Sequence, residues 1–139
     1  MLTPLRVKLR IRARHSGKEV TVKALVNTGF TSDFPEIAIP ASLAQDLRLW
    51  PKPGEEAVMV SLETGGGVVE GYIIPQAVIV QVVTEDQMSR EVVANTLINP
   101  YIEDVLISDY LAEELQIQIL YPRRGIRKFT YEDKIRESE

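Results

Sequence analysis

The feature of this 139-residue sequence with the clearest chemical potential is a short polar loop that follows an apolar run. Residues 24–26, Ala-Leu-Val, lead directly into Asn27, Thr28 and Gly29. The pattern predicts a buried strand that ends in a tight loop, because Asn and Gly favour turns and Gly accepts unusual dihedral angles. Taken alone, such a loop is an ordinary strand-ending turn, so its meaning depends on what else the chain contains.

A second apolar run, residues 105–107, is followed by Ser108. It predicts a short buried strand and then a helix that Ser108 caps, with Asp109 in the first turn. Between the two motifs, residues 64–67 (Thr-Gly-Gly-Gly) predict the tip of a hairpin formed by strands 57–62 and 68–74. A phosphate-binding loop is disfavoured there, because neither a helix nor Gly-Lys-Ser/Thr follows.

The two motifs and the hairpin together resemble the retropepsin-like aspartic proteases, especially those found outside viruses, over residues 5–120. In that family an apolar strand ends in Asp-Thr-Gly or Asp-Ser-Gly, a hairpin forms a flap, and a second apolar run precedes a glycine and a short helix. The resemblance implies an all-β fold with two short helices, a retropepsin-like acid protease barrel equivalent to one half of a pepsin-type fold. It implies a protease domain over 1–121 and a charged C-terminal tail over 122–139. The residues it assigns are Asn27, Thr28 and Gly29 to the catalytic loop, and Phe30, Gly65, Gly66 and Gly67 to substrate binding.

The reaction implied by the resemblance is peptide hydrolysis by a water molecule activated between two Asp carboxylates that share one proton. The chain contains one such loop, so the resemblance implies a homodimer in which each subunit supplies one loop. Thr28 would then brace the two loops. The substrate would be an extended peptide or unfolded protein under the closing hairpin, with no cofactor and no metal. Phe30, Ile73 and Ile74 are candidates for apolar pocket walls, and each could equally be a core residue.

Two departures from the family pattern concern Asn27, at the place of the catalytic Asp, and Ser108, at the place of a glycine. Asn has the shape of Asp but cannot ionise, so the chain as given is expected to bind substrate without cleaving it. One explanation is that an Asp was replaced to abolish activity, and it is favoured because the other features of the protease pattern are preserved. The alternative is a natural pseudoprotease that serves as a dimerisation or peptide-binding module. A slow chemical change at Asn27 is a third explanation. We do not assign a catalytic role to two other carboxylates: Asp33 is assigned to a turn and Glu63 to the hairpin.

Other reaction classes find little support in the composition. Cysteine is absent, which removes disulfides, thiol nucleophiles and thiolate metal sites, and fits a cytoplasmic protein. The single histidine, His15, falls in a predicted turn, so neither a histidine metal cluster nor a Ser-His pair is expected. No apolar run approaches the ~20 residues of a membrane span, and neither a span nor a signal peptide is expected.

The net charge of −4 is unevenly distributed. Residues 1–23 carry seven Lys or Arg and one Glu, whereas residues 24–120 carry three basic and fifteen acidic residues. The basic residues at the N-terminus alternate with apolar ones over residues 6–14, which predicts a strand with one apolar and one basic face. Nucleic-acid binding is not expected, because no aromatic residues are interleaved and no known motif is present. We expect the basic face to be solvated or paired with acidic groups.

The periodicity of apolar residues along the chain predicts the elements that position the loop. Further strands are predicted at 19–26, 34–39, 77–83, 91–97 and 116–121. A helix is predicted after Pro40, with Leu43 and Leu47 on one face, ending before Pro51. From Pro122 onward we expect a mobile tail or a short helix. Segments 5–9 and 116–121 are dimer-interface candidates by resemblance only.

Overall fold

A computed structural model describes residues 2–27, 29–51, 54, 56–64 and 67–138, with the side chains of all these except 2–4 and 64. Within these residues the chain is mostly strand, with two short helices, as the sequence predicts. The elements are β1 (Leu2–Ala13), β2 (Glu19–Asn27), β3 (Glu36–Ile39), α1 (Ala41–Asp46), β4 (Val58–Thr64), β5 (Gly67–Val82), β6 (Val92–Ile98), β7 (Val105–Ile107), α2 (Asp109–Glu114), β8 (Ile117–Tyr121), β9 (Ile126–Phe129) and β10 (Arg136–Glu137). Neither helix in this part of the chain has the length and apolar character needed to cross a membrane.

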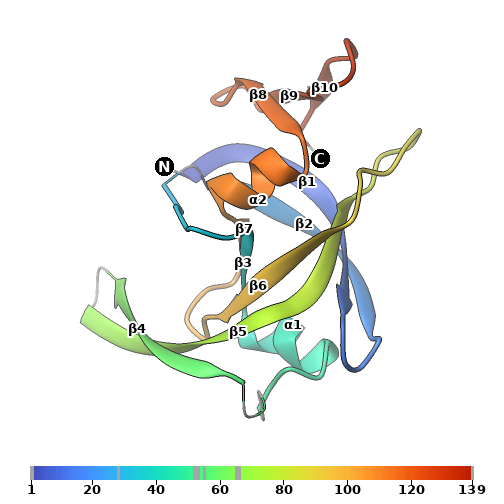
Figure 1. The fold of residues 1–139 in the computed structure, drawn as a ribbon. Coiled ribbons are helices and arrows are strands. Elements are labelled where there is room, and N and C mark those ends of the chain that lie inside the picture. Colours follow the sequence, from blue (N-terminus) through green and yellow to red (C-terminus); the bar gives the residue numbers. More distant parts are fainter. Residues whose placement is uncertain (1, 28, 52–53, 55, 65–66, 139) are drawn as a thin grey trace.

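Six strands close into a barrel in the order β1-β2-β7-β3-β6-β5, because β1 also pairs with β5 (Figure 1). The alternation in β1 is confirmed: Val7, Leu9 and Ile11 are fully buried in the core, and the basic residues point outward. Part of this basic face is paired with acidic residues. Arg10 lies 2.8 Å from Glu19, and Arg12 of the same strand also forms an ion pair.

The predicted strands 68–74 and 77–83 are in fact one 16-residue strand, β5. A register shift between Ile74 and Val78 bends the strand, and Gln76 has a positive φ of 50° at this point. Pro75 lies at this irregularity, which is where a proline can be accommodated inside a strand. The first half of β5 pairs with β4 and forms the hairpin that projects from the barrel, whereas the second half closes the barrel against β1 (Figure 1).

The expectation of a mobile tail or a short helix after Pro122 is wrong. The segment forms β9 and β10, which join β8 in a three-stranded antiparallel sheet at the top of Figure 1. Phe129 is fully buried and Arg136 is 8% exposed. The high charge of the segment suggested disorder, but Arg136 is buried and pairs with Glu132 of the same segment and with Asp86 of the turn between β5 and β6.

Candidate active site

The two sequence motifs meet because β2 and β7 are adjacent and parallel. Leu25 is level with Leu106 and Val26 with Ile107, so Asn27 and Ser108 come next along the two strands, at the same edge of the sheet. The pairing of β2 with β7 therefore places the two sequence motifs side by side, as the resemblance to the aspartic proteases requires.

Two more polar residues lie at the same level of the barrel wall. β3 runs antiparallel to β7, with Ile37 opposite Ile107, which places Glu36 level with Ser108. β6 pairs with β3 on its other side, with Asn95 opposite Glu36. Asn27, Ser108, Glu36 and Asn95 therefore form a line across four neighbouring strands, here called the polar row.

A line of apolar residues runs beside the polar row on the same outer face of the wall. Side chains alternate along a strand, so residues two positions from the polar row share its face. Leu25 and Ala38 are buried at this position, although they point away from the barrel core. The members of this apolar floor are Leu25, Leu106, Ala38, Leu97 and Ile73. Ile74 instead points into the core and is 4% exposed, so it is not a pocket wall.

The loop after β2 is tied to the start of α2. The side-chain oxygen Oδ1 of Asn27 accepts a hydrogen bond from the Gly29 amide at 3.0 Å, and the Asn27 carbonyl accepts one from the Phe30 amide at 3.0 Å. The carbonyl of Phe30 in turn accepts from the Asp109 amide at 3.0 Å. Asn27 and Phe30 are half-buried and Gly29 is exposed. Thr28 lies outside the described residues, so its bracing role stays a prediction.

Ser108 fixes both the helix and the neighbouring strand. Its hydroxyl accepts hydrogen bonds from the Leu111 amide at 3.1 Å and the Glu36 amide at 3.2 Å, and its own amide donates to the Glu36 carbonyl at 3.0 Å. The predicted helix cap is confirmed. The hydroxyl also links β7 to β3, a contact that a glycine could not supply.

Glu36 is a member of the polar row that the sequence analysis missed. Its side chain is half-buried, and burial raises the pKa of its carboxyl. No ion pair joins it to any residue that the structure describes. A signal for the row was present in the sequence: Leu25 and Asn27, like Leu106 and Ser108, are an apolar and a polar residue spaced two apart at a strand end.

The hairpin has one apolar face and one mixed face, on which Met59 and Val68 are exposed beside two glutamates. Residues on the face shared with the apolar floor include Val60, Leu62 and Val69, whereas Glu63 and Glu70 lie on the other. At its base, a Cβ added to Gly71 would lie 2.7 Å from Cδ1 of Leu62 and 2.8 Å from the Ile98 carbonyl oxygen, so only glycine fits without rearrangement. Gly67 opens β5 with a φ of 122°, and Gly65 and Gly66 lie outside the described residues.

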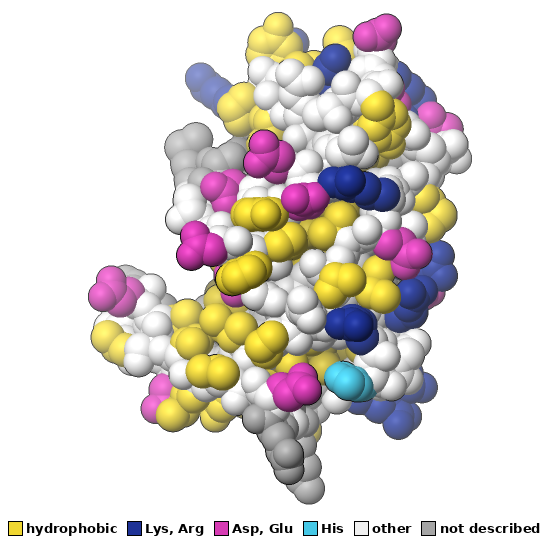
Figure 2. Space-filling model, viewed as in Figure 1, with side chains coloured by type: hydrophobic (Ala, Val, Ile, Leu, Met, Phe, Trp, Pro, Cys, Tyr) yellow, Lys and Arg dark blue, Asp and Glu magenta, His cyan; other side chains and the backbone are white. Residues whose placement is uncertain are grey.

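Acidic residues dominate the segments around the polar row. Segments 27–36, 58–73 and 99–110 together contain seven acidic residues and no Lys or Arg. Figure 2 shows acidic and apolar side chains around the hairpin at the lower left, and basic side chains along the right-hand edge. The described residues contain no group of three or more His, Asp or Glu that could hold a metal ion.

Two pockets formed by the described residues lie away from the polar row. One of about 640 Å³ is bordered by Lys8, Lys23 and the C-terminal segment, and one of about 280 Å³ lies beside His15 and Glu56. Neither includes a member of the polar row. No protein-family model matches the sequence, and no curated protein matches it at a significant level.

Proposed function

We propose that this chain is a retropepsin-like aspartic endopeptidase that acts as a homodimer, and that Asn27 leaves it able to bind a peptide without cleaving it. The observation that carries the proposal is the parallel pairing of β2 and β7, which sets Asn27 beside Ser108 and the start of α2. The hydrogen bond from the Asp109 amide to the Phe30 carbonyl ties the loop to that helix.

The chemistry would need an aspartate at position 27 in both subunits. Two carboxylates close together share one proton, so one can act as a base toward water while the other donates a proton to the substrate carbonyl. The pair titrates as a unit. With Asn27 in both subunits the shape of the site is kept, but no group at this position can take up or release a proton.

The surroundings suit an extended peptide. The apolar floor and the apolar face of the hairpin offer alternate side-chain pockets along a strand-like ligand, whose main chain can form hydrogen bonds. The hairpin projects from the barrel, where closure over a ligand would exclude water (Figure 1).

The direct test is the Asn27→Asp variant, assayed for cleavage of an unfolded protein from acid to neutral pH. We expect cleavage by the variant and none by the chain as given. The matched control is Asp33→Asn, placed in the Asn27→Asp background, which removes the exposed carboxylate nearest in sequence and should leave cleavage intact. Absence of cleavage by Asn27→Asp, together with failure to bind a transition-state mimic, would reject the protease proposal.

A non-catalytic module is the alternative. It is favoured by the hydrogen bond from the Gly29 amide to Asn27 Oδ1, since this contact makes Asn27 a well-placed turn residue in its own right. In that case Asn27→Asp stays inert, while the chain as given still dimerises or binds peptides.

A further inference from the structure

We propose that Glu36 determines specificity by binding a lysine or arginine side chain of the extended peptide that lies along the apolar floor. The inference rests on the proposed function, because it names the substrate class of the same site. It concerns a residue outside the two sequence motifs.

The position of Glu36 is fixed relative to the candidate catalytic loop. Ser108 lies between Glu36 and Asn27 in the polar row, so the two are two strands apart, about 10 Å at the usual strand spacing. Both main-chain groups of Glu36 are bonded to Ser108, at 3.0 and 3.2 Å. A ligand that reaches Asn27 along the outer face therefore passes within side-chain reach of Glu36.

The carboxylate of Glu36 lacks a partner among the residues that the structure describes. Partial burial removes part of its hydration, which is why its pKa is raised. A charge that is withdrawn from water without a counter-charge costs free energy. A cation carried by the ligand would offset this cost, and no basic residue occurs in the three segments around the site to compete for it.

Neighbouring carboxylates are less suited to this role. Asp33 is exposed, and Asp109 already accepts a hydrogen bond from the Tyr110 amide at 2.7 Å. Among the carboxylates that the structure describes, Glu36 alone combines partial burial with a place next to the apolar floor. The aliphatic stem of a lysine or arginine can pack on the half-buried floor residues Leu106 and Leu97 while its charged end reaches the carboxylate.

The experiment measures binding of the chain as given to pools of short peptides built from Ala, Val, Leu and Phe. The pools differ only at the central residue, which is Lys, norleucine or Glu. We expect the Lys pool to bind about tenfold more tightly than the norleucine pool, as one charge-assisted contact allows. Glu36→Gln should abolish this preference and leave norleucine binding unchanged, and Glu36→Lys should reverse it toward the Glu pool. Asp33→Asn is the matched control and should keep the preference.

The outcomes separate the two claims. Equal binding of the Lys and norleucine pools, or a Lys preference that survives Glu36→Gln, would overturn the role of Glu36 and leave the proposed function standing. Failure of every pool to bind, with no cleavage by Asn27→Asp, would remove both. A second readout guards against a misfolded variant: in the unmodified chain, the NMR-monitored pKa of Glu36 should fall when the Lys pool binds.

Discussion

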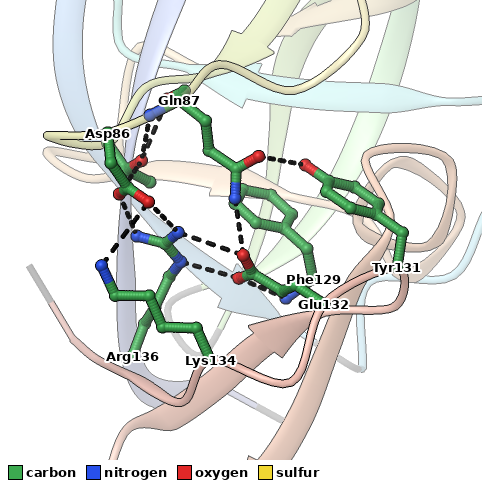
Figure 3. A network of polar contacts seen from close by, with 8 residues as sticks. Asp86, Gln87, Phe129, Tyr131, Glu132, Lys134 and Arg136 are labelled. Carbon is green, nitrogen blue, oxygen red and sulfur yellow. Dashed lines mark hydrogen bonds and ion pairs between the residues drawn. The ribbon is translucent and has the colours of Figure 1, made fainter.

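Two regions of this molecule handle charged groups in opposite ways. One is the C-terminal clamp, in which Asp86 and Gln87 of the β5–β6 turn meet Tyr131, Glu132 and Arg136 of the C-terminal segment (Figure 3). The other is the polar row on the barrel wall. The clamp is built from ion pairs and side-chain hydrogen bonds. The row is held by main-chain groups together with the Ser108 hydroxyl and the side-chain oxygens of Asn27 and Asn95, with no ion pair among the described residues.

The charges of the clamp are satisfied within the chain. Arg136 donates to both oxygens of Asp86 at 2.8 and 3.0 Å and to Glu132 at 2.8 Å, and it lies 5.4 Å from the centre of the Phe129 ring. These bonds lower the pKa of the Asp86 and Glu132 carboxyls. Gln87 donates to Glu132 at 2.6 Å and accepts from Tyr131 at 3.2 Å.

The polar row leaves its one carboxylate without such a partner. Glu36 has a raised pKa because burial is not offset by a counter-charge. A region that serves only stability can complete its own contacts. A region that binds a ligand or a second subunit has polar groups without partners in the isolated chain, and these groups lower its stability until the partner binds. The comparison therefore predicts different responses to substitution in the two regions.

The largest effect is expected for Arg136→Met. The substitution leaves Asp86 and Glu132 near each other without the buried cation. Because the Asp86 side chain is 47% exposed, the expected loss of unfolding free energy is below the full cost of breaking a buried pair, at about 2 kcal/mol. Chemical denaturation measures the loss. Arg123→Met is the control, because Arg123 is exposed and should change stability by about 0.5 kcal/mol or less. Equal effects of the two substitutions would mean that the clamp does not hold the C-terminal sheet.

A second prediction concerns the proposed dimer and the substitution Asn27→Asp. At neutral pH facing carboxylates repel and lose hydration, so the chain as given should dimerise at least as tightly as the variant. We expect a dissociation constant up to about tenfold higher for the variant, since one pKa unit corresponds to about 1.4 kcal/mol. Analytical ultracentrifugation measures it. The gap should shrink in acid, where the pair is protonated, and a gap that stays equally large there would show that repulsion is not its cause.

Ser108→Ala should lower the free energy of unfolding by about 1 kcal/mol, through its effect on the part of the barrel that carries the polar row. The hydroxyl accepts from the Leu111 and Glu36 amides, and loss of a helix cap typically costs this much. Ser42→Ala in α1 is the control, because Ser42 is exposed and is not a member of the polar row. Thermal unfolding compares the two. If Ser108→Ala changes the midpoint no more than Ser42→Ala does, the hydroxyl does not brace β3.

The sequence predicts the elements of the barrel well and the clamp poorly, and the reason is physical. Alternation in β1, the apolar runs before Asn27 and Ser108, and the cap at Ser108 are local signals, and the structure confirms them. The polar row depends on which strands become neighbours, a long-range property, although the spacing of Leu106 and Ser108 gave a hint. The clamp was missed because a charged segment resembles a disordered one until its partner, the turn at Asp86, is known.

The smallest predicted effects are those of substituting Glu36 and Glu132 on stability, and they are expected to have opposite signs. The pKa of Glu36 is raised by burial, so its contribution to stability is present below its unfolded pKa of about 4.3 and is lost as pH rises through the folded value. The pKa of Glu132 is lowered by hydrogen bonds from Arg136, so its contribution is present above the unfolded pKa and is lost as pH falls through the folded value.

At neutral pH Glu36→Gln should therefore stabilise the fold, by about 0.5 kcal/mol or less, and Glu132→Gln should destabilise it. Urea midpoints at neutral and acid pH measure both, and each difference should shrink in acid. If both substitutions shift the neutral midpoint in the same direction, the two regions do not differ in the way that the contacts indicate.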